Sequence, residues 1–281
     1  MPETPISSTI RHHIENHILH VELQTPKRSS EDIEKDLKTF EEKYRKVIEV
    51  GWIVCITDNP MGLLSYGAME TIDLLGLPVH PEQLVVHLNT FHPKKELDEI
   101  LEAFKAAGGK YLLAVSGDGS QRLHRLEPAE VGIEATTVTS VELLLYFDRE
   151  YPGQFTTGVA FNPYEPQDHE LEKMKRKVGA GAQFIITQPI IGRDDNLEVL
   201  KPFGLPVILD AWMSKKLHLL SECVGHEIPE GTPYDPMENL KELRRNYPDY
   251  GLYLAILGFK TQYPLIPEIW KSPSDGARSP G

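Results

Sequence analysis

Apolar and polar positions divide the chain into two kinds of alternating segment. Eight short runs are rich in Val, Ile, Leu or aromatic residues and are bounded by Gly, Pro, Asn or Asp, which is typical of buried parallel strands. These runs are residues 20–24, 52–57, 83–88, 111–116, 155–161, 183–188, 205–211 and 251–257. Segments with helical spacing of apolar residues lie between them. They are residues 29–50, 95–107, 139–150, 167–179, 192–203, 213–225 and 236–247.

Strands that alternate with helices predict βαβ units and a parallel sheet. Eight such units in 281 residues match the size of an α/β protein of the (β/α)8 TIM-barrel class. The alternative, an open doubly wound sheet, usually has fewer strands and a Gly-rich first turn, which this sequence lacks. We expect residues 1–281 to form a single catalytic domain, because no linker interrupts the pattern. The ends, about 1–8 and 272–281, are polar and rich in Ser, Pro and Gly, and we expect them to be flexible.

Composition narrows the class of protein. The net charge is −13 and the chain has no long basic run, which argues against nucleic acid as a partner. No apolar run approaches the roughly 20 residues of a membrane span, and the N-terminus does not resemble a secretory signal. Cys55 and Cys223 are far apart, which fits a reduced compartment, so we expect a cytoplasmic protein without a membrane partner.

No metal site is expected from the sequence. Four histidines gather near the N-terminus, but no carboxylate or cysteine completes a ligand set, and we expect a solvated segment instead. These histidines are His12, His13, His17 and His20.

Polar residues follow the predicted strands at their C-terminal ends, where a barrel carries its catalytic groups. They are Glu22, Thr57 with Asp58 and Asn59, His87 with Asn89, Asp118, Asn162, Gln188 and Asp210. Any one of them could be polar only because strand ends meet solvent. The set formed by Glu22, His87, Asp118 and Gln188 nevertheless indicates a convergent polar site.

Several of these segments resemble the methylenetetrahydrofolate reductases. VELQTPK (21–27), CITDNPMG (55–62), VVHLNT (85–90), LAVSGD (113–118) and LPVILDAWM (205–213) are similar to the family's first, second, third, fourth and seventh strands. The strongest similarity is GVAFNP followed by LEKMKRKVGAGAQFIITQP (171–189), which is a helix, an Ala-Gly-Ala turn and a strand that ends in Ile-Thr-Gln. The resemblance covers roughly residues 18–260.

This resemblance implies the reduction of 5,10-methylenetetrahydrofolate to 5-methyltetrahydrofolate, with NADH or NADPH as hydride donor and FAD as bound cofactor. Glu22 matches the family's general acid, which protonates the departing nitrogen when the methylene bridge opens. Asp118 matches a second catalytic residue, an aspartate between flavin and folate. Gln188 matches a residue that binds the pterin. The resemblance therefore implies that Gln188, Glu22 and Asp118 together bind the folate substrate. The positions implied to contact the cofactor are Thr57, His87, Gly117, Asp118, Arg176 and Lys177.

Three departures from the family pattern keep other hypotheses open. Ser116 stands where the family has arginine, AFNPYEPQDHE (160–170) replaces a His-containing loop, and YLAILGFK (253–260) lacks the family's asparagine. A flavin-independent reductase is therefore the second hypothesis. A barrel that transfers the methyl group of methylfolate to a corrinoid protein is the third, and a non-catalytic folate- or flavin-binding subunit is the fourth. The partners would be the folate, a corrinoid protein or methyltransferase, or further copies of the chain.

Overall fold

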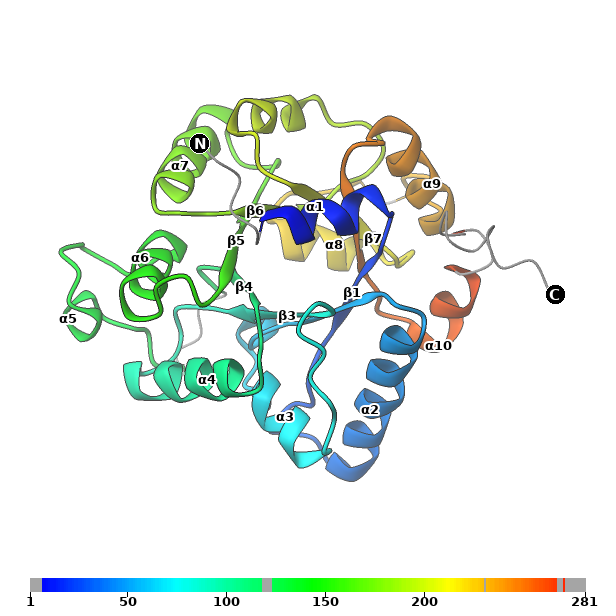
Figure 1. The fold of residues 1–281 in the computed structure, drawn as a ribbon. Helices are drawn as coiled ribbons and strands as arrows, with labels where there is room; N and C mark the ends of the chain where they lie inside the picture. Colours follow the sequence, from blue (N-terminus) through cyan, green and yellow to red (C-terminus); the bar gives the residue numbers. More distant parts are fainter. Residues whose placement is uncertain (1–6, 118–122, 230, 267–269, 271–281) are drawn as a thin grey trace. The chain divides into compact units, whose positions relative to one another are not determined.

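The computed structural model describes residues 7–117, 123–229, 231–266 and 270. Eight parallel strands close into a barrel in the order β1-β2-β3-β4-β5-β6-β7-β8, and helices alternate with them (Figure 1). The strands are β1 (His20–Leu23), β2 (Ile53–Ile56), β3 (Leu84–Leu88), β4 (Tyr111–Ala114), β5 (Thr156–Phe161), β6 (Phe184–Pro189), β7 (Val207–Trp212) and β8 (Gly251–Ala255). The predicted (β/α)8 barrel is confirmed.

Each of the predicted helical segments contains a helix, but the sequence pattern did not predict the helices at Ser7–Glu15 and Ala68–Leu74. The predicted helix over 192–203 forms a 3-10 helix in the structure, and one of its last residues is Pro202. The elements are α1 (Ser7–Glu15), α2 (Ile33–Glu49), η1 (Pro60–Gly62), α3 (Ala68–Leu74), α4 (Lys94–Ala106), α5 (Pro128–Val131), α6 (Ser140–Glu150), α7 (Gln167–Gly179), η2 (Asp195–Phe203), α8 (Leu217–Val224), α9 (Pro236–Asn246), α10 (Phe259–Gln262) and η3 (Tyr263–Leu265). No helix of the described residues is long and apolar enough to cross a membrane.

The chain divides into two compact units. The first unit consists of Met1–Glu22, Phe161–Met174 and Phe184–Gly281, and the second of Leu23–Ala160 and Lys175–Gln183. The first unit thus holds β6, β7, β8 and most of β1, while the second holds β2, β3, β4 and most of β5. The single domain over residues 1–281 stays a prediction, and the tail 272–281 lies outside the described residues.

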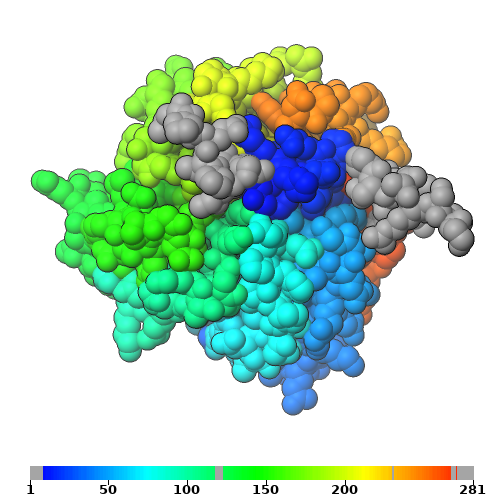
Figure 2. Space-filling model, viewed as in Figure 1, coloured from blue at the N-terminus to red at the C-terminus, as the bar shows by residue number. Residues whose placement is uncertain are grey.

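In the first unit, α1 packs onto the strands. An added Cβ on Gly251 of β8 would lie 3.1 Å from Ile14 Cγ1, so the glycine gives α1 room to approach the strand. In Figure 2 the blue atoms of α1 adjoin the orange atoms of the α9 region. His13 is 3% exposed and His20 is 0% exposed, with ring centroids 5.7 Å apart. The prediction of a solvated histidine segment is therefore wrong for these two residues, because α1 buries them.

In the second unit, parallel pairing joins β2 to β3, β3 to β4 and β4 to β5. Helices cover the sheet with apolar residues at helical spacing. From α4, the side chains of Leu97, Leu101 and Phe104 are buried. This sheet presents the carboxyl ends of β2, β3 and β4 at one edge, because its strands are parallel.

Candidate active site

Two carboxyl groups lie close together in the first unit, one on β1 and one on β7. Glu22 of β1 is partly exposed, and the Tyr253 hydroxyl donates a hydrogen bond to its Oε2 at 3.0 Å. Tyr253 lies on β8, directly opposite Asp210 of β7 in the strand register. We call Glu22, Asp210 and Tyr253 the carboxyl cluster. A phenol that donates to a carboxyl oxygen fixes the orientation of that carboxyl group.

Asp210 is the buried member of the carboxyl cluster. It is 7% exposed, and its Oδ1 is buried without a hydrogen-bond partner among the described residues. Burial raises the pKa of Asp210 well above its ordinary value, and the negative charge of Glu22 raises it further, while a backbone hydrogen bond from Ala255 opposes the shift. The environment therefore favours a protonated Asp210 beside Glu22.

We expect Asp210→Asn to raise the unfolding midpoint at pH 7 by about 2–4 °C. For a chain of this size that rise corresponds to about 1 kcal/mol in the free energy of unfolding. Because its folded pKa is raised, Asp210 stabilises the fold fully only below its unfolded pKa, about 3.9, and this stabilisation is lost as pH rises toward the folded value. The gain from asparagine should therefore shrink near pH 4. Thermal unfolding at both pH values, with the exposed Asp249→Asn as control, tests this. A variant less stable at pH 7 would contradict it.

Gln188 lies at the carboxyl end of β6, also in the first unit. The register between β6 and β7 shifts between Ile186 and Pro189, and Pro189 lies opposite Asp210. The Asp210 amide donates to Thr187 Oγ1 at 3.1 Å, which ties the irregular end of β6 to β7. Glu22 and Gln188 thus come from the same ends of parallel strands in one unit, as the sequence predicted for each strand. Their roles stay predictions.

Thr57 and His87 lie in the second unit at the carboxyl ends of β2 and β3. The Thr57 amide donates to Leu23 O at 3.2 Å, and its buried Oγ1 has no hydrogen-bond partner among the described residues. Burial lowers the pKa of His87 to about 4, although the negative charge of Asp58 acts in the opposite direction. At neutral pH His87 is consequently an uncharged imidazole.

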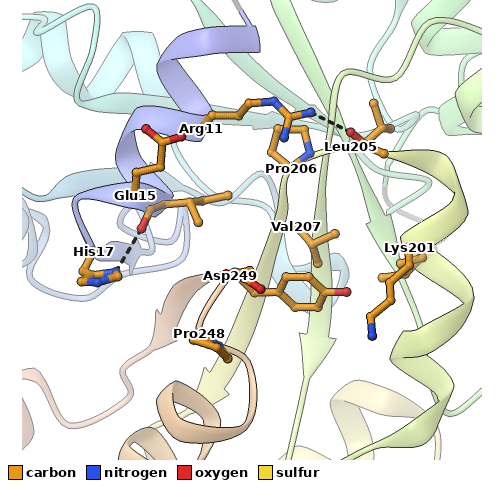
Figure 3. A pocket seen from close by; sticks show the side chains of 13 residues that line it. Arg11, Glu15, His17, Lys201, Leu205, Pro206, Val207, Pro248 and Asp249 are labelled. Atoms are coloured by element: carbon orange, nitrogen blue, oxygen red, sulfur yellow. Dashed lines mark hydrogen bonds between the residues drawn. The ribbon is translucent and has the colours of Figure 1, made fainter.

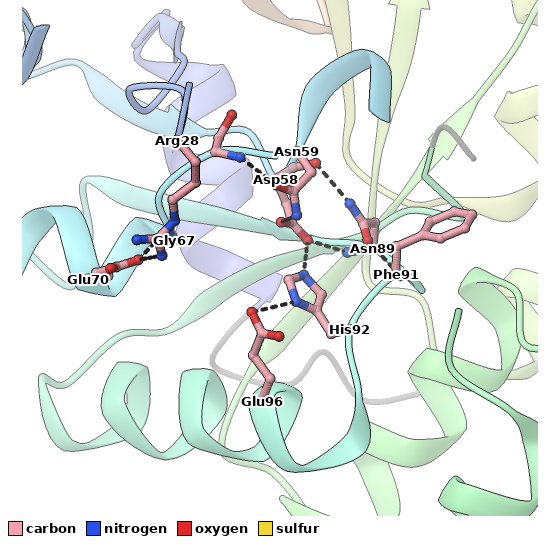
Figure 4. Close-up of polar contacts among 10 residues, drawn as sticks. Arg28, Asp58, Asn59, Gly67, Glu70, Asn89, Phe91, His92 and Glu96 are labelled. Atoms are coloured by element: carbon pink, nitrogen blue, oxygen red, sulfur yellow. Dashed lines mark hydrogen bonds and ion pairs between the residues drawn. The ribbon is translucent and has the colours of Figure 1, made fainter. Parts of the chain in front are cut away.

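A polar network connects the turns that follow β2 and β3 (Figure 4). The Asp58 carboxylate accepts from the Asn89 amide at 2.9 Å and from His92 Nε2 at 2.7 Å. The Asn89 side chain donates to the Asp58 carbonyl at 2.9 Å. On its other side, His92 Nδ1 lies 3.3 Å from Glu96 Oε1 in the first turn of α4. Among the described residues, no group of three His, Cys, Asp or Glu side chains could hold a metal ion.

Sequence reasoning missed His92 and Glu96. Asp58 and Asn89 were visible as polar residues at strand exits, but His92 lies four residues past the end of β3. The available signal was the spacing of His92 and Glu96, four residues apart at a helix start, which allows the two side chains to meet.

Gly117 follows β4 and packs against this network. Its φ is +77°, and an added Cβ would lie 2.7 Å from Asn89 Cβ and 3.0 Å from Phe91 Cδ2. The carbonyl of Ser116, which replaces the family's arginine, accepts from Thr90 Oγ1 at 2.8 Å. Contacts within the fold therefore account for this glycine. Asp118, predicted to act beside Glu22, lies outside the described residues.

Arg176 and Lys177 lie in the last turn of α7, and both are engaged within the second unit. Lys177 is 9% exposed, and its Nζ donates to the Ala160 carbonyl at 2.6 Å. Arg176 is exposed, and its Nη2 lies 3.4 Å from Glu142 Oε1. The contact of these two cations with FAD that the resemblance implies stays a prediction, and a cofactor phosphate would compete with these internal partners.

A hollow of about 530 Å³ lies elsewhere in the first unit (Figure 3). Among its lining residues are Arg11, Glu15, His17, Lys201 and Asp249. Val207 and Tyr250, which also line it, stand at the amino ends of β7 and β8. The carboxyl cluster lies toward the other end of these strands. Because barrel enzymes carry their chemistry at the carboxyl ends, this hollow is not the candidate active site.

Comparisons with solved structures find the same fold in proteins of low sequence identity. An uncharacterised protein from Clostridium thermocellum that binds two copies of 5-methyl-5,6,7,8-tetrahydrofolic acid has a TM-score of 0.54 and 13% identity, covering 87% of this chain and 91% of its own. A 2,3-dimethylmalate lyase of the PEP mutase/isocitrate lyase superfamily has a TM-score of 0.51 and 10% identity, covering 95% and 84%. At these identities the likeness concerns the fold alone.

Sequence comparison is more specific. A search of curated proteins found no match. The family model of methylenetetrahydrofolate reductase, however, matches residues 12–202, which is more than half of the chain and includes every predicted site residue. The chain therefore belongs to the methylenetetrahydrofolate reductase family.

Proposed function

We propose that this protein reduces 5,10-methylenetetrahydrofolate to 5-methyltetrahydrofolate with NADH or NADPH as hydride donor. The observation that carries the proposal is the hydrogen bond from Tyr253 to Glu22, which presents a partly exposed carboxyl group at the carboxyl end of a barrel strand. Membership of the family supports a folate substrate, and so does the methylfolate bound by the Clostridium thermocellum protein of the same fold.

The chemistry needs one hydride and one proton. When the five-membered ring opens, the bond between the methylene carbon and N10 breaks, and N10 must gain a proton. We propose that Glu22 supplies that proton as a general acid, since a positioned carboxylic acid can do so. The resulting iminium carbon accepts the hydride, so that the folate gains a methyl group and the nicotinamide is oxidised. Because burial and the neighbouring charge disfavour two negative charges, the pair formed by Glu22 and Asp210 keeps a proton, and the proposal requires Glu22 to carry that proton when the ring opens.

The residues fit FAD at one end better than at the other. The Thr57 hydroxyl, which has no hydrogen-bond partner within the described part of the chain, and the uncharged His87 suit the polar edge of a flavin ring. A bound FAD would carry the hydride on that ring. At the phosphate end, Lys177 is buried against the Ala160 carbonyl and Arg176 faces Glu142. We propose FAD as the carrier on the strength of Thr57 and the family resemblance.

The second candidate function is the same reduction without flavin. The internal contacts of Lys177 and Arg176 favour it, because cations already engaged in the fold bind phosphates less well. Ser116 in place of arginine favours it too, because it removes a further cation.

Anaerobic assays of the purified full chain test both versions. NADH or NADPH oxidation should depend on methylenetetrahydrofolate. A flavin absorbance band, or a rate that rises with added FAD, would support the first version. With nicotinamide deuterated at the transferred position, direct transfer should place the label in the methyl group, whereas exchange on a flavin carrier should dilute it. Absence of folate-dependent oxidation with either nucleotide, with and without FAD, would overturn both versions.

A further inference from the structure

His92 is held between two carboxylates, one on each ring nitrogen. Nε2 lies 2.7 Å from Asp58 Oδ2 in the turn after β2, and Nδ1 lies 3.3 Å from Glu96 Oε1 in α4. The side chains of His92 and Asp58 are 6% and 11% exposed, while that of Glu96 is 55% exposed. A ring whose two nitrogens both face carboxylates donates at both, and that requires the imidazolium form.

The charges around His92 support this form. Burial opposes the charge, but the hydrogen bonds and negative charges of Asp58 and Glu96 outweigh it and raise the pKa of His92 to about 10. The positive charge of Arg28, in the segment after β1, favours the ionised form of Glu96, and Arg28 itself pairs with Glu70 of α3. On β3, His87 feels the charge of Asp58.

Asp58 is the point where His92 meets the proposed active site. It directly follows Thr57, and its carboxylate and carbonyl both accept from Asn89, two residues after His87. A bare Asp58 carboxylate would attract a proton to His87. Because His92 Nε2 lies 2.7 Å from Asp58 Oδ2, the imidazolium and the carboxylate together carry almost no net charge. The electric field of Asp58 at His87 is therefore weakened.

We infer that His92 is a positioning residue: its imidazolium joins the turn after β2 to the start of α4 and neutralises Asp58, so that Thr57 stays in place and the field of Asp58 at His87 is weakened. An uncharged His87 can accept a hydrogen bond from a ligand as well as donate one. The inference deepens the proposed function and rests on it for the identity of that ligand.

The test compares three variants of the full chain by NMR titration of His87. His92→Gln removes the charge and keeps polar atoms, and it should raise the pKa of His87 by about one unit or more. Asp58→Asn with His92→Gln removes both charges and should return His87 to its parental titration. Glu96→Gln is the control, because its carboxylate is half exposed and leaves Asp58 paired; it should leave the His87 titration unchanged.

Thermal unfolding gives a second readout. The folded pKa of His92 is raised, so its stabilisation is fully present below the unfolded value of about 6.5 and is lost as pH rises through about 10. The unfolding midpoint of His92→Gln should therefore fall further below that of the parental chain at pH 6 than at pH 10.

An unchanged His87 titration in folded His92→Gln, or a double variant in which His87 stays shifted, would overturn the inference. If His92→Gln does not fold, His92→Asn, a smaller neutral replacement, is titrated in its place and should give the same rise in the His87 pKa; no rise would overturn the inference. These readouts need no folate turnover. A protein that lacks reductase activity but shows the predicted titrations would refute the proposed function and leave the electrostatic role of His92 standing.

Discussion

Replacing Glu22 by glutamine is expected to lower folate-dependent turnover by about 100- to 10,000-fold, because glutamine keeps the size and hydrogen bonding of the side chain but cannot donate the proton. Cofactor binding should be nearly unchanged, since loading the hydride donor needs no proton on the folate. The measurement is steady-state NADH or NADPH oxidation beside nucleotide and FAD binding.

Two further variants make the test of Glu22 specific. Glu15→Gln changes an exposed glutamate of α1 in the same unit and should leave turnover at the parental rate. Tyr253→Phe removes only the hydroxyl that orients Glu22, so a smaller loss, of about tenfold, is expected. If Glu22→Gln retains more than about a tenth of parental turnover, Glu22 is not an essential acid.

Replacing Gly117 by alanine is expected to destabilise the protein by about 2–4 kcal/mol, which corresponds to a fall of roughly 5–15 °C in the unfolding midpoint. Two causes add up. The φ of +77° is unfavourable for alanine, and the new Cβ would lie 2.7 Å from Asn89 Cβ. Asn89 cannot move aside freely, because it is tied to Asp58 by two hydrogen bonds.

Gly51→Ala separates these causes. Gly51 has a φ of +78°, but nothing lies within 4 Å of an added Cβ, so this variant suffers the backbone strain alone. The free energy of unfolding of Gly51→Ala should be about 1–2 kcal/mol lower than that of the parental chain. Thermal unfolding of both variants gives the difference, which belongs to the contact with Asn89. Equal losses in the two variants would show that Gly117 does not pack as described.

The barrel could be predicted because its signal is local. Each strand is a short apolar run between turn residues, and every predicted strand matches an observed one to within two residues at each end. The first helix was missed because its local signal is weak. Between Ile10 and Ile14 the buried side chains are those of Ile10, His13 and Ile14, and the histidines in and around this helix suggested a solvated segment instead of a packed one.

The site was predictable only in part, because its contacts join distant segments. Glu22 and Gln188 could be placed at strand ends, and Asp210 was visible as a polar exit residue. That Tyr253 of the last strand would reach Glu22 of the first follows from barrel closure, which places β8 beside β1. Likewise, the pairing of His92 with Asp58 depends on how two turns fold, and no pattern along the chain reports it.

The central claim is tested most directly by the product. The purified chain is incubated without oxygen with methylenetetrahydrofolate and NADH or NADPH, with and without FAD, and folates are quantified by mass spectrometry. The account predicts one 5-methyltetrahydrofolate formed for each nicotinamide oxidised, and little product from Glu22→Gln under the same conditions. A folded parental chain that leaves methylenetetrahydrofolate unchanged under all four conditions would contradict it.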